Sequence, residues 1–283
     1  MAVMSLSDGR QLGYATMGDP AGFPVVVLHG TPGSWRQLRV LDRPGRDAGA
    51  AVIASDRAGY GESSYDPGSI VGSSAQDIGQ LIRHLGLAAC PVVGLSGGGP
   101  TALACGVLLG GDVSGVATVG SPAPLVPRDP ALPPDRLVTR LAKLSPAAAH
   151  ALFSVILRSG RSNPEKALSR FAALVAEPDA LLLRENAEVR DAFLDDMAHP
   201  SATTARAAAR DFVLLTRPWD LDLAEMTVPA QVWHGTEDRN VPVAHARVIS
   251  DRCAAAQLHI VEGGGHMLLS HAGEILASVA PSA

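Results

Sequence analysis

Cysteines and metal-ligand patterns are scarce in this chain. Its 283 residues include only three cysteines, Cys90, Cys105 and Cys253, an odd number and too widely spaced for a Cys-x-x-Cys pair. A disulfide framework and a zinc knuckle are therefore not indicated, and buried thiols are expected. The nine histidines form no His-Glu-x-x-His or similar ligand spacing. We therefore expect neither a metal nor another cofactor.

Positive charge and long apolar runs are also missing. The 23 Lys and Arg residues against 28 Asp and Glu give a formal net charge of −5, which provides no field to attract a nucleic acid. No run of about 18 apolar residues predicts a membrane span, and the N-terminus lacks the basic start and apolar core of a secretory signal. These absences predict a cytoplasmic protein with a small-molecule substrate, and they leave the oligomeric state open.

The apolar residues that are present occur in short runs. A hydrophobic content of 47% over this length suffices for one large α/β domain. The Asp8-Gly9 dipeptide predicts a hairpin between strands at 3–6 and 10–17. Helix-compatible stretches separate further strand-like runs, which predicts a parallel sheet with crossover helices. These runs are 24–28, 51–54, 91–95, 113–119, 230–233 and 257–261.

The region between the fourth and fifth of these runs has a different amino-acid composition. Five prolines crowd into residues 124–134, and Ala- and Leu-rich helical segments then continue to about Leu215 without a strand pattern. Asn163-Pro164 is typical of a helix start, and Glu177-Pro178 of a further break. We therefore predict a core of residues 1–123 and 216–283 with an inserted helical cap at 124–215. In the core, helices are expected at 74–85, at 243–253 and after Met267.

A glycine-rich turn follows the strand at 91–95. The sequence Gly94-Leu95-Ser96-Gly97-Gly98 stands between a buried strand and a helix, the context of a Gly-x-Ser-x-Gly nucleophile elbow. Such a turn needs small neighbours around its serine. The pattern predicts Ser96 as the nucleophile and the Gly97 backbone N–H as one donor to an oxyanion.

The same turn also fits a competing interpretation. Gly97-x-Gly99-x-x-Ala102 after a strand is similar to a dinucleotide-binding loop. That loop requires an acidic residue at the end of the next strand to hold a ribose. Here the next strand ends at Gly120-Ser121, and Asp112 lies before it. The missing acid favours the elbow.

A serine nucleophile needs a histidine base and an acid, which in this fold follow it in the order acid, then histidine. Asp238 lies in a loop after the strand at 230–233, and His266 follows the strand at 257–261. Both should project from the carboxyl edge of the sheet. Glu237 is a less favoured acid, structural roles are expected for His234 and His259, and His271 is expected to belong to the last helix.

The loop after the first parallel strand, His29-Gly30-Thr31-Pro32-Gly33, should carry the second oxyanion donor. Thr31 is the candidate because it has a backbone N–H, which Pro32 lacks. His29 is expected to bind the loop backbone. Trp35 and Met267 flank these loops and are candidates for the pocket wall, with ordinary packing as the alternative.

Taken together, five motifs resemble the α/β-hydrolase superfamily: the His29 to Gly33 loop, Asp56 to Ser63, the Ser96 elbow, Gly235 to Asp238 and Gly264 to His266. The resemblance implies the α/β-hydrolase fold, with a mostly parallel sheet flanked by helices and the helical cap inserted. It further implies a Ser96, Asp238, His266 triad, an oxyanion hole of the Thr31 and Gly97 amides, and a structural turn at 56–63.

The serine at the elbow separates this chain from dehalogenases and epoxide hydrolases of the same fold, which carry aspartate there. We expect hydrolysis of a carboxylic ester of a small to medium, fairly apolar substrate, because Leu- and Ala-rich cap helices would line an apolar pocket. An aminopeptidase of the proline iminopeptidase type is an alternative, with Glu177, Glu185 or Glu188 binding the substrate amine. A ligand-binding receptor, a lyase and a cofactor-free perhydrolase also remain open.

Overall fold

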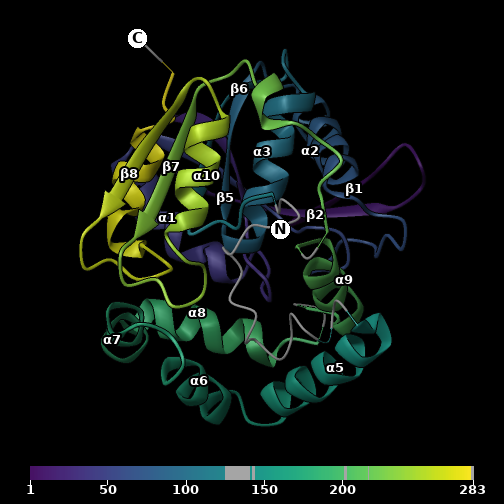
Figure 1. The fold of residues 1–283 in the computed structure, drawn as a ribbon, viewed down its shortest axis with the longest axis vertical. Helices are drawn as coiled ribbons and strands as arrows, with labels where there is room; N and C mark the ends of the chain where they lie inside the picture. The colour runs from purple at the N-terminus through teal and green to yellow at the C-terminus, as the bar shows by residue number, and fades with distance from the viewer. Residues whose placement is uncertain (125–140, 142–143, 201–202, 216, 282–283) are drawn as a thin grey trace.

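A computed structural model describes residues 1–124, 141, 144–200, 203–215 and 217–281, and an eight-stranded sheet forms its centre (Figure 1). The strand order is β1-β2-β4-β3-β5-β6-β7-β8, in which the β1–β2 and β2–β4 pairs are antiparallel and the other pairs are parallel. The strands are β1 Ala2–Ser5, β2 Gln11–Gly18, β3 Phe23–Leu28, β4 Ala50–Ser55, β5 Cys90–Leu95, β6 Val113–Val119, β7 Ala230–Gly235 and β8 Ala256–Val261. The predicted hairpin and mostly parallel sheet are confirmed.

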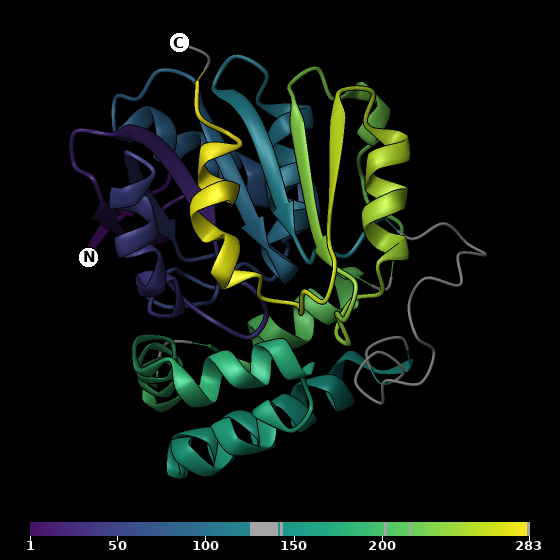
Figure 2. The same ribbon diagram turned by 90° about the vertical axis from the view of Figure 1, so that its left-hand side faces the viewer.

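Helices cover both faces of the sheet (Figures 1 and 2). One face packs on α2 (Val71–His84), α3 (Gly99–Leu108) and α10 (Ala244–Arg252), and the other on α1 (Asp42–Asp47) and α11 (Ala272–Ala277). Strand β3 shows why its run is continuously apolar: Val26 and Leu28 join the first core, and Val25 and Val27 the second. A strand buried on both faces needs apolar side chains at every position.

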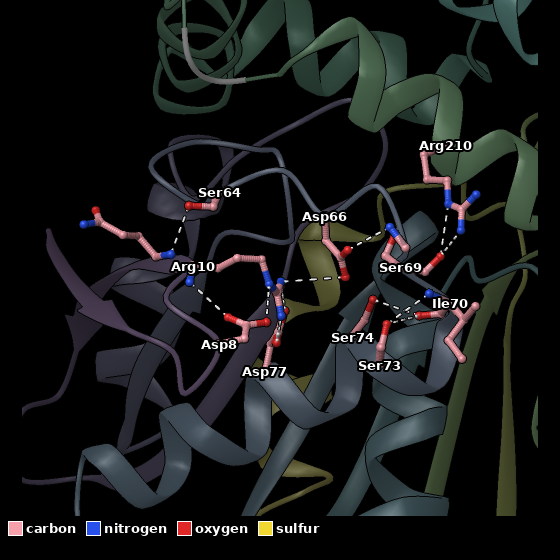
Figure 3. Close-up of polar contacts among 12 residues, drawn as sticks. Asp8, Arg10, Ser64, Asp66, Ser69, Ile70, Ser73, Ser74, Asp77 and Arg210 are labelled. Atoms are coloured by element: carbon pink, nitrogen blue, oxygen red, sulfur yellow. Dashed lines mark hydrogen bonds and ion pairs between the residues drawn. The ribbon is translucent and has the colours of Figure 1, made fainter.

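Helix α2 begins at Val71, three residues before its predicted start. The Ser73 hydroxyl accepts a hydrogen bond from the Ile70 backbone N–H at 3.0 Å, so this serine lies within the first turn and caps the helix from inside. The N-terminal hairpin is tied to the same helix by Arg10, which donates to both carboxylate oxygens of Asp77 at 2.7 and 2.8 Å (Figure 3).

In the part of the chain that the structure describes, five helices lie beyond the carboxyl ends of the parallel strands (Figure 2): α5 Pro146–Ser162, α6 Pro164–Ala172, α7 Glu177–Glu185, α8 Ala187–Ala198 and α9 Ala205–Leu215. We call them the cap helices. The predicted Asn163 cap is confirmed, because its side chain accepts from the Lys166 N–H at 2.9 Å. The predicted proline-rich linker falls almost wholly outside the described residues, and the domain limits remain a prediction. Among the described helices, none is long and apolar enough to cross a membrane.

Candidate active site

Ser96 directly follows β5 and has a φ of 49°, a left-handed conformation that strains a residue with a side chain. Glycines make room for this turn. A Cβ atom on Gly94 would lie 2.5 Å from the Gly98 carbonyl oxygen, and one on Gly98 would lie 2.6 Å from the Leu28 carbonyl oxygen. The strand, the sharp turn and helix α3 therefore form the predicted elbow, with Ser96 at its apex.

His266 and Asp238 meet on the neighbouring loops. The His266 Nδ1 atom lies 2.7 Å from the Asp238 Oδ2 atom, and the Asp238 side chain is fully buried. Its second oxygen, Oδ1, accepts from the backbone N–H groups of Asn240 and Val241 at 2.7 and 2.9 Å. With Asp238 accepting at Nδ1, the Nε2 atom of a neutral His266 is left free to take a proton.

A second histidine contacts the same carboxylate. His234, at the end of β7, places its Nε2 atom 3.2 Å from the Asp238 Oδ2 atom and 2.9 Å from the Val241 carbonyl oxygen. Burial alone would raise the pKa of Asp238, but hydrogen bonds from His234 and His266 hold it well below its usual range. The expected structural role of His234 therefore includes support of the candidate acid itself.

Ser96 and His266 both lie at the end of β6: Ser96 follows Leu95, which pairs with Val119, and His266 lies against Gly120. A Cβ atom on Gly120, just after β6, would lie 2.9 Å from the His266 Nδ1 atom. One on Gly30 would lie 3.3 Å from the Ser96 Cβ atom. Within the described part of the chain, the Ser96 hydroxyl makes no hydrogen bond to His266. Such bonds commonly tighten only when a substrate is bound.

The two candidate oxyanion donors also lie side by side. A Cβ atom on Gly97 would be 2.3 Å from the Thr31 hydroxyl oxygen and 3.3 Å from the Thr31 backbone nitrogen. The buried His29 ring holds this loop in place, because its Nδ1 atom lies 2.8 Å from the Gly30 carbonyl and its Nε2 atom accepts from the Arg57 N–H at 3.1 Å. The expected structural role of His29 is confirmed.

Gly97→Ala should lower kcat by about 10²-fold, the typical cost of misplacing one oxyanion donor. The added methyl group would push against Thr31, whose hydroxyl is held by charged partners and cannot turn away freely. Gly110→Ala is the matched control, since its Cβ would meet nothing within 4 Å. Steady-state kinetics of both variants, after circular dichroism has confirmed folding, give the measurement. Equal activity of the two variants would contradict this placement of the oxyanion hole.

Sequence reasoning missed three carboxylates that the cap helices extend to the loops of the site. Asp179 on α7 accepts from the backbone N–H groups of His266 and Met267. Asp196 on α8 accepts from Gln37 at 2.8 Å and from the Ser34 hydroxyl.

The third carboxylate is Asp211 on α9. Its Oδ2 atom accepts from the Thr31 hydroxyl at 2.5 Å and the Tyr60 hydroxyl at 2.6 Å, and it lies 2.8 Å from Arg57 Nη1. Burial opposes the charge of Arg57, but Asp211 reverses this and raises the guanidinium pKa. Each contact spans more than 80 residues of chain, so no local pattern points to it.

Trp35 and Met267 are the two residues predicted as candidates for the pocket wall. Trp35 and Met267 both pack against the core on the α11 side of the sheet, and Trp35 also lines an open groove with Arg39 and Glu188.

The turn at 56–63 is organised by Asp56, whose buried carboxylate accepts from the Trp35 and Glu62 N–H groups at 2.8 and 3.0 Å. Burial raises the pKa of Asp56 to about 6.

The three cysteines are buried free thiols, as expected. Burial raises the pKa of Cys90 to about 12 and that of Cys253 to about 11, so neither is a thiolate at neutral pH. Within the described ranges, no group of three or more His, Cys, Asp or Glu side chains is placed to hold a metal ion.

A positive-φ serine at the end of a central strand, beside a His–Asp pair on later loops, is the arrangement of α/β hydrolases. Family comparison agrees with it: the chain belongs to the alpha/beta hydrolase family, whose model matches residues 25–279. The predicted fold and superfamily are therefore confirmed. This membership supports an enzyme of the hydrolase class and leaves its substrate open.

Individual relatives differ in their reactions. A non-heme chloroperoxidase from Streptomyces lividans is 29% identical over 289 residues, which cover 98% of this chain and 96% of the relative. A bromoperoxidase structure from Bacillus anthracis is similar with a TM-score of 0.73, and an esterase structure from Exiguobacterium antarcticum with a TM-score of 0.71. Both structures are 22% identical, and the matches cover 98% of this chain and 96% of the other. At that identity they establish the fold alone.

Proposed function

We propose that this protein is a serine carboxylesterase that cleaves a small to medium, fairly apolar ester through an acyl-enzyme on Ser96. The observation that carries the proposal is the buried Asp238 carboxylate at 2.7 Å from His266 Nδ1, on loops next to a serine held at a φ of 49°. A hydroxyl alone is a weak nucleophile, and an oriented histidine is the usual means of activating it.

In the proposed mechanism, His266 Nε2 takes the Ser96 proton as the serine oxygen bonds to the ester carbon. Asp238 keeps the imidazole in the correct tautomer and stabilises the imidazolium, while the Thr31 and Gly97 amides donate to the oxyanion. Collapse of the tetrahedral intermediate breaks the bond to the alcohol, which leaves with the proton from His266. Water then gives a proton to His266, attacks the acyl-enzyme and releases the acid, and the proton returns to Ser96.

The positions of the acidic cap residues favour an ester over an N-terminal peptide amine. Glu177 is exposed and pairs with Arg184 at 2.5 Å. Glu185 and Glu188 line a groove together with Gly263–Gly265. Ser96 is not among the described residues that line this groove. An aminopeptidase would need one of these carboxylates to face the scissile bond.

Perhydrolysis is the second candidate, and the relationship with the non-heme chloroperoxidase over 98% of the chain favours it. The same acyl-enzyme would be attacked by hydrogen peroxide instead of water and release a peracid. No new protein group is needed, since His266 would deprotonate either nucleophile.

A substrate panel tests the proposal. We expect turnover of p-nitrophenyl esters of graded acyl length, with no hydrolysis of proline or alanine arylamides. Fluorophosphonate should label the wild type and leave Ser96→Ala unlabelled. Peracid formation from acetate and peroxide measures perhydrolysis separately. Saturable binding of an ester without turnover, or equal labelling of the variant, would refute the esterase.

A further inference from the structure

The loop that carries His266 is fixed from the side of the cap. Asp179, in the first turn of α7, accepts from the His266 backbone N–H at 2.7 Å through Oδ2 and from the Met267 N–H at 3.0 Å through Oδ1. Its side chain is almost completely buried, with 1% of the residue exposed. An acidic residue in a first turn usually faces the N–H groups of its own helix, whereas this one serves the neighbouring loop.

The fit between carboxylate and loop is close. A Cβ atom on Gly265 would lie 2.4 Å from Asp179 Oδ2, and one on Gly235 would lie 2.2 Å from the Gly264 carbonyl oxygen. On its other side the loop is joined to the Asp238 turn, because the Gly264 carbonyl accepts from the Glu237 N–H at 2.9 Å. The peptide of His266 is therefore held between two carboxylate-bearing elements, one from the core and one from the cap.

Asp179 also contributes charge. Of the described residues, two carboxylates face His266: Asp238 from the loop after β7, in contact with the ring, and Asp179 from α7, in contact with the backbone. The His234 ring contacts Asp238 as well. Burial raises the pKa of Asp179, and the Met267 and His266 N–H groups oppose that shift. A negative charge at this site stabilises the imidazolium that forms when His266 takes a proton.

We propose that Asp179 is a positioning residue for His266, through which cap helix α7 fixes the place and charge of the imidazole. This inference rests on the proposed role of His266 as the base. It makes α7 a functional part of the site and not only a cover over it. Asp196 and Asp211 bind the opposite loop, so Asp179 is the carboxylate of this set that touches the peptide of His266 itself.

The test compares Asp179→Asn with Glu177→Gln, a control on the same helix turn whose exposed carboxylate pairs with Arg184. Asparagine keeps the size but loses the charge, and it leaves one of the two N–H groups facing an amide NH₂. We expect Asp179→Asn to lower kcat by about 10-fold or more with little change in KM, as misplacement of a catalytic group does. The acidic limb of the rate profile should move to lower pH, because a charge that favours imidazolium is gone. Glu177→Gln should match the wild type.

A second readout does not depend on turnover. In ¹³C-histidine-labelled protein carrying Ser96→Ala, NMR titration of the His266 ring, assigned by its loss in His266→Gln, should give a lower pKa with Asp179→Asn than without it. An unchanged titration overturns the positioning role, even if activity and melting temperature both fall. If wild-type protein hydrolyses no ester, the proposed function fails while this titration still decides the role of Asp179.

Gly265→Ala provides a second variant should Asp179→Asn not fold. Its methyl group would press on the Asp179 carboxylate while leaving the charge in the protein. We expect a shift of the His266 ring resonances and a fall in kcat. Wild-type resonances and wild-type kcat in Gly265→Ala would overturn the proposal.

Discussion

Ser96→Ala should lower kcat for p-nitrophenyl esters by about 10⁴-fold or more, which is the usual loss when a serine nucleophile is removed and only the oxyanion amides and substrate binding remain. The alanine lacks the oxygen that would bond to the ester carbon, while the elbow around it is unchanged. Steady-state and single-turnover kinetics measure the effect. Ser162→Ala, on the exposed end of α5, is the control and should keep wild-type activity. A Ser96→Ala variant with a tenth of the wild-type rate would rule out the acyl-enzyme.

Ser96→Gly adds a stability test of the same assignment. The φ of 49° at this position strains any residue that carries a Cβ atom, and glycine adopts it freely. Ser96→Gly should therefore be as inactive as Ser96→Ala but more resistant to urea, by about 1 kcal/mol of unfolding free energy, a typical relief for one strained residue. Such a gain would indicate that the site holds its serine at the expense of stability. Equal stability of the glycine and alanine variants would argue against a strained elbow.

The sheet and the elbow were predictable because their signals are local. Each parallel strand is a short apolar run, and Gly94, Ser96 and Gly98 stand within five residues of one another. The strand order was not specified in this way. Strand β4 lies between β2 and β3, so β2 and β3 are consecutive in the chain but are not neighbours in the sheet. Crossover geometry and packing set this arrangement, and no single apolar run encodes it.

The supporting contacts of the site escaped prediction for a different reason. Asp179 lies 87 residues before His266, and in the sequence it looks like any acid in the first turn of a helix. His234 sits in an apolar strand, where a buried histidine is usually structural, yet its ring contacts Asp238. The Asp179 contact is too distant in sequence for a local pattern, and the His234 contact joins residues only four apart across the turn that follows β7, so only the folded arrangement reveals them.

The Arg57–Asp211 pair carries the largest expected effect on stability. Arg57 is 9% exposed, and its Nη1 atom lies 2.8 Å from Asp211 Oδ2, the same oxygen that accepts from Tyr60 and Thr31. Asp211→Ala would leave a buried guanidinium without its counter-charge and two hydroxyls without their acceptor. Removing one partner of a buried pair costs on the order of 3 kcal/mol, and urea unfolding should show a loss of about that size.

The matched control for Asp211→Ala is Asp195→Ala on α8, whose carboxylate is 46% exposed and lies 3.3 Å from Arg39. An exposed pair contributes about 0.5 kcal/mol, so the two aspartates should differ several-fold in their effect. Asp211→Asn keeps an acceptor for Thr31 and should fall between them. Because the Thr31 hydroxyl is bound to Asp211, kcat of the folded Asp211→Ala variant should also fall, whereas Asp195→Ala should keep it. A fall in stability with wild-type kcat would limit Asp211 to fastening α9 onto the core and leave the oxyanion loop independent of the cap.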